Sequence, residues 1–157
     1  ISHVLEYNSM KHIIRKSFIL PSGDNNDLVE FLYEDDRIVR LTGYYKNSIS
    51  GYTDYLYDNN GNIIMQTSYH MSSAGIAELS TTREFEFDNM HNPYKSFRQL
   101  LTPGIYTNPN NITKETYTLN FDVDPSIEKV QITEYKYDYN ANGYPVKVNG
   151  ETEYVYR

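Results

Sequence analysis

The side chains of this 157-residue sequence that could bind a metal or transfer a proton are 21 acids and four histidines, and cysteine is absent. No two histidines have the spacing of metal ligands, and without cysteine there is no thiolate for zinc, for a disulfide or for thiol catalysis. Segments 24–27 and 58–62 are rich in Asn and Asp but lack the Gly and Glu positions of an EF-hand, so they indicate turns. The histidines are His3, His12, His70 and His91. We therefore predict no metal site and no cofactor.

Catalytic motifs are also missing. The sequence has no Gly-x-Ser-x-Gly motif and no serine beside an obvious base. A glycoside hydrolase needs two carboxylates that face each other across a cleft. With 21 acids in the chain, some pair is close by chance, so closeness alone does not indicate catalysis. We predict that the protein is not an enzyme and assign no catalytic residue, with a glycan-acting hydrolase as the alternative.

Tyrosine is the one residue type in excess, with 17 copies against six of phenylalanine. Its ring is apolar and its hydroxyl polar, which suits half-buried strands and contact surfaces. An exposed tyrosine beside asparagine can stack on a sugar ring or a peptide and hydrogen-bond to it. Tyr44 and Tyr45 cannot both face inward from one strand, and Tyr106 lies in a loop rich in Pro and Asn. These three are our candidates for a binding surface, the alternative being surface tyrosines with no partner.

The tyrosines belong to a motif that recurs along the chain: an aromatic residue, one other residue, a second aromatic, and then an acid or Asn. Alternation with a period of two indicates half-buried strands. Asn60-Gly61 and Asn142-Gly143 predict two-residue hairpin turns, which acids before the turn, such as Asp58, Asp88 and Asp138, could cap. The clear copies are FLYEDDRIVRL from Phe31, YLYDNNGNIIM from Tyr55, FEFDNMHNP from Phe85 and YKYDYNANGYPVKV from Tyr135.

Aromatic residues fall on one face of these strands, and acids with cations from the returning strands fall on the other. This pattern predicts an all-β fold: one curled antiparallel meander of about 8–11 strands, forming a single domain over residues 1–157. Residues 93–101 are expected to form one short helix, with Asn92 as its N-cap and Pro93 in its first position. Whether the domain is trimmed from a longer exported chain is left open.

The segment YDNNGNI resembles the YD repeat of RHS-type bacterial surface proteins, in which Tyr-Asp-x-x-Gly drives consecutive hairpins. More specifically, FDNMHNPYKSF, NNITKETY and YKYDYNANGYPVKV, in that order, resemble a group of uncharacterised surface lipoproteins of gut Bacteroidetes, described as antiparallel sheets of porin-like curvature. The likeness extends over nearly the whole chain. It implies an exported protein of the periplasm or outer-membrane surface, tethered through a lipidated N-terminus that this sequence does not include. It implies no catalytic residues.

Charge and hydropathy narrow the choice of partners. The net charge is −7 and the isoelectric point is about 5.0, which weighs against nucleic acid and anionic membrane as partners. No apolar run is long enough for a transmembrane helix. We therefore expect a non-enzymatic module of the cell envelope that binds a glycan, a peptide or an envelope protein. A structural piece of a longer YD-repeat shell is a further alternative.

Overall fold

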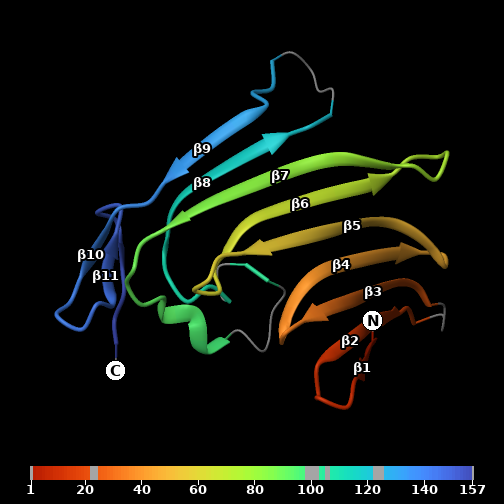
Figure 1. Ribbon diagram of the computed structural model, residues 1–157, viewed down its shortest axis with the longest axis horizontal. Helices are drawn as coiled ribbons and strands as arrows, with labels where there is room; N and C mark the ends of the chain where they lie inside the picture. The colour runs from red at the N-terminus through yellow and green to blue at the C-terminus, as the bar shows by residue number, and fades with distance from the viewer. Residues whose placement is uncertain (1, 22–24, 98–102, 105–106, 122–125, 157) are drawn as a thin grey trace. The chain divides into compact units, whose positions relative to one another are not determined.

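The computed structural model of the chain describes residues 2–21, 25–97, 103–104, 107–121 and 126–156. These residues form twelve strands and one short 3₁₀-helix, which confirms the all-β prediction. Nine strands follow one another in an antiparallel meander, in the order β1 to β9 (Figure 1). They are β1 (Ser2–Tyr7), β2 (Ile13–Ile19), β3 (Asn25–Glu34), β4 (Arg37–Tyr45), β5 (Ser48–Tyr57), β6 (Ile63–Met71), β7 (Ala77–Phe87), β8 (Ile112–Leu119) and β9 (Val130–Glu134).

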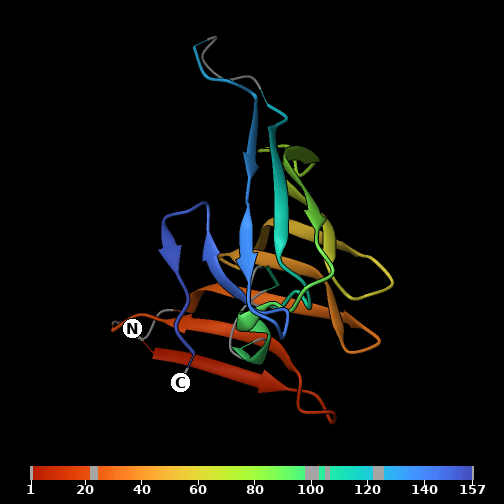
Figure 2. The same cartoon turned by 90° about the vertical axis from the view of Figure 1, so that its left-hand side faces the viewer.

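A second sheet, which the sequence did not predict, contains β10 (Tyr137–Tyr139), β11 (Pro145–Val148) and β12 (Thr152–Glu153) (Figure 2). The backbone changes sheets between two adjacent residues. The N–H of Tyr135 still donates to the C=O of Thr113, at 2.8 Å, and so continues the pairing of β9 with β8. The N–H of Lys136 instead donates to Oδ1 of Asn149, and the C=O of Lys136 accepts from the N–H of Asn149, both at 2.8 Å. The hydrogen bonds between Lys136 and Asn149 thus end the pairing of this segment with β8, and with it the meander.

The chain forms two compact units. The first unit contains residues 1–55 and 67–81, and the second contains residues 56–66 and 82–157. Strands β5, β6 and β7 contribute residues to both units.

Four hairpin loops share one five-residue geometry, at Asn8–His12, Asp58–Asn62, Ser72–Ile76 and Asn140–Tyr144. The N–H of the first residue donates to the C=O of the fifth, and the N–H of the fourth donates to the C=O of the first, at 2.9–3.1 Å. A side-chain oxygen of the first residue also accepts from the N–H of the fifth, at 2.8–3.2 Å. This is a turn capped by its own first side chain.

The fourth residue of each loop has a positive φ, which glycine adopts without strain. These residues are Lys11 (64°), Gly61 (91°), Gly75 (75°) and Gly143 (75°). The prediction of two-residue turns at Asn60-Gly61 and Asn142-Gly143 is therefore wrong, because the capping side chain closes a longer loop with a left-handed residue at its end. Asp58 caps its turn as predicted, whereas Asn140, and not Asp138, caps the last one.

Three other hairpins do have two-residue turns, in which both central residues have a positive φ. That is the requirement of a type I′ turn, which Asn, Asp and Gly meet most easily. The pairs are Asp35-Asp36, Lys46-Asn47 and Asn149-Gly150, with φ between 46° and 72°. The Glu34-Asp35-Asp36 segment therefore forms a tight turn without glycine.

The short 3₁₀-helix η1 (Pro93–Phe97) begins where the sequence predicts a helix. Oδ1 of Asn92 accepts the N–H of Tyr94 at 3.0 Å, which confirms the predicted cap. The N–H of Lys95 donates to the C=O of Asn92 at 3.3 Å, and this three-residue spacing defines a 3₁₀-helix rather than an α-helix. The rest of the predicted helix, residues 98–101, lies outside the described residues.

Few apolar side chains are buried in the part of the chain that the structure describes. Tyr55 is 8% exposed, as the aromatic-inward prediction requires, and its neighbour Leu56 is 54% exposed. The buried apolar residues besides Tyr55 are Ile63, Ile112 and Pro145. Five polar residues are equally buried: Ser17, Asn62, Asn92, Asn108 and Asn111.

Candidate binding surfaces

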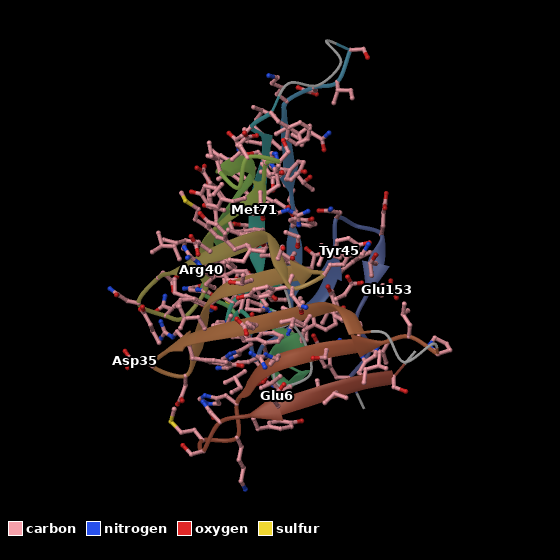
Figure 3. The ribbon with its side chains drawn as sticks, turned by 90° about the vertical axis from the view of Figure 1, so that its right-hand side faces the viewer. Glu6, Asp35, Arg40, Tyr45, Met71 and Glu153 are labelled. Carbon is pink, nitrogen blue, oxygen red and sulfur yellow. The ribbon has the colours of Figure 1, made fainter. Side chains whose placement is uncertain are left out.

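The predicted binding candidates do not form one site. The hydroxyl of Tyr44, which is half-buried, donates to Oε2 of Glu30 at 2.7 Å. Tyr45 is 54% exposed, with Nζ of Lys46 5.2 Å from its ring centre (Figure 3). Successive residues of a strand point to opposite faces, so the two tyrosines are separated as the sequence indicated. Tyr106 lies outside the described residues.

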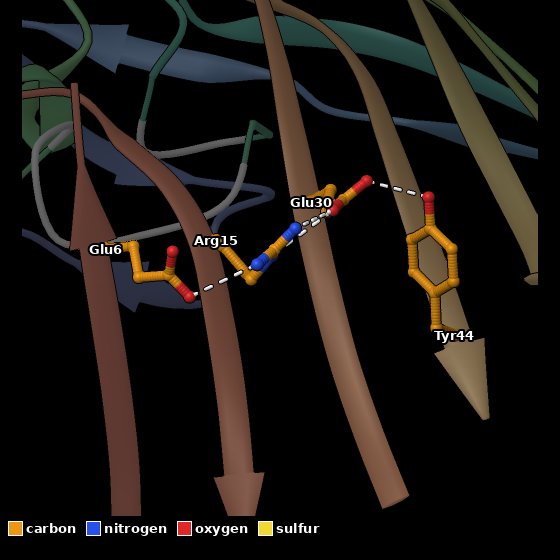
Figure 4. Close-up of polar contacts among 4 residues, drawn as sticks. All are labelled: Glu6, Arg15, Glu30 and Tyr44. Atoms are coloured by element: carbon orange, nitrogen blue, oxygen red, sulfur yellow. Dashed lines mark hydrogen bonds and ion pairs between the residues drawn. The ribbon is translucent and has the colours of Figure 1, made fainter. Parts of the chain in front are cut away.

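Tyr44 instead ends a charged row that crosses β1, β2, β3 and β4 (Figure 4). Nη1 of Arg15 lies 3.4 Å from Oε1 of Glu6, and Nη2 of Arg15 lies 2.6 Å from Oε1 of Glu30. The strand register places Glu6 opposite Arg15 and Arg15 opposite Glu30. These are the cross-strand pairs of acids and cations that the sequence predicts.

The row contains one cation between two carboxylates, so its charges are partly compensated. The hydrogen bond from the Tyr44 hydroxyl, followed by that from Arg15, lowers the pKa of the Glu30 carboxyl below its usual value. Both oxygens of that carboxylate therefore already have donors. A carboxylate in this state stabilises the sheet surface modestly, because exposed ion pairs contribute little, and it is poorly suited to accept a proton from a substrate.

A second row crosses β4, β5 and β6. Arg40 donates to both carboxylate oxygens of Asp54, with Nη2 at 2.8 Å from Oδ2. Its guanidinium also lies 4.3 Å from the ring centre of Tyr52, and the ring of Tyr69 stacks on Tyr52 at 4.7 Å. Because β4 and β6 lie on either side of β5, Arg40 and Tyr69 cover opposite faces of the Tyr52 ring. That ring is occupied by packing and leaves no free face for a ligand.

The second unit carries a different feature, an exposed aromatic cluster of His91, Tyr144 and Tyr156. The ring centre of Tyr144 lies 5.0 Å from that of His91 and 5.6 Å from that of Tyr156. Tyr144 is 39% exposed and Tyr156 is 46% exposed, and His91 is exposed as well. The Tyr156 hydroxyl donates to the C=O of Pro145 at 2.6 Å, which fixes the orientation of its ring. Three rings in contact are thus open to solvent.

The capped turn at Asn140–Tyr144 positions this cluster. The N–H of His91 donates to the C=O of Gly143 at 3.0 Å, which brings His91 beside the turn. The exposed side chain of Asn142 lies in the same turn, two residues before Tyr144. The cluster therefore combines aromatic rings with a neighbouring amide.

The same unit contains a largely buried network of asparagines, here called the asparagine network: Asn62, Asn92, Asn108, Asn110 and Asn111. Nδ2 of Asn62 donates to Oδ1 of Asn110 at 3.0 Å, and Oδ1 of Asn62 accepts the N–H of Asn110 at 3.0 Å. Oδ1 of Asn108 accepts the N–H of Ile63 at 2.9 Å, and its C=O accepts from Nδ2 of Asn92 at 2.8 Å. The network ties segment 108–111 to the start of β6 and to the residue before η1.

Asp88 completes the network on the side of the small sheet. Its Oδ1 accepts the N–H of Asn111 at 3.1 Å and the N–H of Met90 at 3.0 Å. Its Oδ2 accepts from Nδ2 of Asn111 at 3.2 Å and from the hydroxyl of Tyr139. Burial, and then the hydrogen bond to Asp88, raise the pKa of the Tyr139 hydroxyl. Asp88 thus holds the residues next to His91 in place.

The sequence pattern did not reveal the aromatic cluster or the asparagine network. The sequence criterion, tyrosine beside asparagine, is met at Tyr144 in the turn that contains Asn142. Segment 107–113, TNPNNIT, reads as an irregular loop, because asparagines have no periodicity to indicate burial. The clustering of Asn in segments 58–62, 89–92 and 108–111 is the signal that was available.

Within the described ranges, no group of three or more His, Cys, Asp or Glu side chains could hold a metal ion. Among the same residues, no helix has the length and apolarity to cross a membrane. No protein-family model matches the sequence, and no curated protein matches it.

Proposed function

We propose that this protein is a non-enzymatic binding module of an exported bacterial envelope protein, and that its exposed aromatic cluster binds glycans. The observation that carries the proposal is the set of contacting, solvent-open rings of His91, Tyr144 and Tyr156 beside the Asn140–Tyr144 turn. Ring faces stack on the C–H groups of sugars, and amides and hydroxyls bind sugar hydroxyls.

Preorganisation supports this site over the tyrosines of the charged rows. A hydrogen bond fixes the Tyr156 hydroxyl, so its ring loses little side-chain freedom when a ligand binds, and a second hydrogen bond fixes the backbone of His91. The net charge of −7 favours neutral or basic sugars over acidic ones. The likeness to YD-repeat surface proteins supports export and a place in the envelope, with a lipid tether outside this sequence.

Two carboxylates, those of Glu30 and Asp58, are poorly suited to glycoside hydrolysis. A glycosidase needs a general acid whose pKa is raised. The pKa of Glu30 and the pKa of Asp58 are both lowered. At Asp58, burial alone would raise the pKa, but hydrogen bonds from Asn62 and from the backbone N–H groups of Asn60 and Gly61 outweigh it.

A glycan array tests the proposal. Wild-type protein should bind a subset of neutral glycans, and Tyr144→Ala should weaken that binding by about tenfold through lost stacking. Tyr45→Ala is the matched control, because Tyr45 is an exposed tyrosine outside the cluster, and it should bind like wild type.

Two results would overturn the proposal. The first is an array on which wild-type protein binds no glycan, or on which Tyr144→Ala binds as tightly as wild type while remaining folded. The second is the appearance of shortened oligosaccharides when bound glycan is incubated with the protein, which would favour the hydrolase alternative.

A further inference from the structure

Strand β9 is an open edge of the nine-stranded sheet. It comes last in the strand order and pairs with β8, and its five residues are all exposed (Figure 1). Figure 2 shows β8 and β9 as neighbouring strands in a side view. An edge strand presents unpaired backbone groups to any further strand that can reach it.

The hydrogen bonds with β8 show which backbone groups of β9 remain free. The N–H of Leu119 donates to the C=O of Lys129 at 2.8 Å, and at the other end the N–H of Tyr135 donates to the C=O of Thr113. Bonding alternates along an antiparallel ladder, so the odd-numbered residues of this segment are turned toward β8. The N–H and C=O groups of Val130, Ile132 and Glu134 therefore point away from the sheet.

Three common means of protecting an edge are missing from β9. Edge strands are commonly blocked by lysine, proline or a bulge. The sequence of β9, VQITE, contains neither lysine nor proline, and its pairing with β8 runs without a register shift. By contrast, the pairing of β1 with β2 at the other edge shifts between Glu6 and Tyr7. Ile132, at the middle of β9, is 60% exposed.

We infer that β9 pairs antiparallel with β9 of a second copy of this chain, about a two-fold axis at Ile132. The sequence of β9 fits itself in this register. Ile132 faces Ile132 of the second copy, Val130 faces Glu134, and Gln131 faces Thr133, so no like charges lie opposite each other. This register uses all three outward-facing residues of each strand and forms about six backbone hydrogen bonds.

Other two-fold registers are less favourable. An axis at Glu134 places two carboxylates directly opposite each other, which is destabilising. An axis at Gln131 or Thr133 leaves one end of each β9 without a partner inside the strand. The inference concerns a surface in β9 and does not depend on the aromatic cluster or on glycan binding.

Cysteine cross-linking tests the register directly, because the chain has no cysteine of its own. A hydrogen-bonded antiparallel pair has its Cα atoms about 5.5 Å apart, within the range of a disulfide. Under mild oxidation, Ile132→Cys should therefore form a covalent dimer. Ile76→Cys is the matched control, since Ile76 is 61% exposed but lies in the turn between β6 and β7, and it should stay monomeric.

Sedimentation velocity supplies the second measurement. Wild-type protein should show a concentration-dependent monomer–dimer equilibrium. Ile132→Lys should weaken dimer association about tenfold or more, because it places two cations opposite each other, whereas Ile76→Lys should not. Circular dichroism checks that both variants remain folded. Wild-type protein that stays monomeric at millimolar concentration would overturn self-pairing and leave a strand of another protein as the partner of this edge. Association without preferential cross-linking at position 132 would also overturn it.

Discussion

Buried asparagine is demanding, because its side chain has two donors and an acceptor oxygen with two lone pairs. In the second unit, the hydrogen bonds that satisfy these groups also hold the backbone in place. Asn62 and Asn108 are each about 1% exposed, and each binds the backbone of a segment distant in sequence. The amides replace strand pairing in segment 108–111, which is not part of a strand.

Removal of one of these side-chain amides should therefore lower the free energy of unfolding. Asn62→Ala leaves the N–H and the Oδ1 atom of Asn110 without their partner, and we expect a loss of about 2–3 kcal/mol in the free energy of unfolding. Urea denaturation measures it. Asn89→Ala serves as control, because Asn89 is exposed, and it should be neutral. Equal stabilities of the two variants would mean that the asparagine network contributes little.

Tyr55 predicts a response to alkaline pH. Burial raises the pKa of its hydroxyl from 10.0 to about 12, so the folded state keeps a proton that the unfolded state loses first. The resulting stability is fully present below pH 10 and disappears as pH rises to 12, by up to about 3 kcal/mol. Tyr55→Phe should make the loss of stability between these pH values less steep than in wild type. Unfolding free energies that fall in parallel for both proteins would contradict this.

Among the secondary-structure elements, the hairpin loops follow a sequence rule that cannot be seen from the Asn-Gly dipeptide alone. Where Asn, Asp or Ser stands three residues before the left-handed residue, as Asp58 does before Gly61, the loop has five residues and a side-chain cap. Asn149-Gly150 has no such residue before it, since Lys147 occupies that position, and it forms a two-residue turn. The dipeptide alone cannot distinguish the two.

Two substitutions at equivalent loop positions should have opposite effects. Gly75 has a φ of 75° and open space around its Cβ position, so Gly75→Ala isolates the backbone strain and should cost about 1 kcal/mol. Lys11 has a φ of 64° at the same position of its loop, so Lys11→Gly should stabilise by about 0.5–1 kcal/mol. Thermal unfolding followed by circular dichroism tests both, and changes of the same sign would contradict the shared geometry.

Much of the strand organisation was predictable, because it rests on local alternation: the strands of the meander and their charged cross-strand pairs are confirmed. The motif copy that begins at Phe85 does not form a hairpin, since η1 and not a returning strand follows β7. The second sheet was not predictable, because the change of hydrogen-bond partner at Lys136 depends on Asn149, a residue on another hairpin. The exposed aromatic cluster was not predictable for a similar reason. His91 and Tyr144 are brought together by a hydrogen bond between segments far apart in sequence.

At the scale of the whole molecule, the composition shows an excess of tyrosine, but only the structure shows which tyrosines are exposed. The tyrosines look alike in sequence, but their surroundings differ. Tyr55 is buried, Tyr52 is covered on both ring faces, and Tyr144 is open to solvent. Burial cannot be read from an aromatic residue alone, which is why the sequence placed binding at Tyr44, Tyr45 and Tyr106. Binding is now proposed where exposure and ring contact coincide.

The scarcity of buried apolar side chains in the described residues determines how the protein responds to temperature. The heat capacity of unfolding comes from newly exposed apolar surface and is reduced by newly exposed polar surface. Because asparagines occupy several buried positions, it should lie below the roughly 1.9–2.4 kcal/mol/K expected for a chain of 157 residues. Scanning calorimetry would then give a flat stability curve, with little change in unfolding free energy between cold and warm conditions. A value within the ordinary range would instead show that unfolding exposes far more apolar surface than the buried residues described here provide.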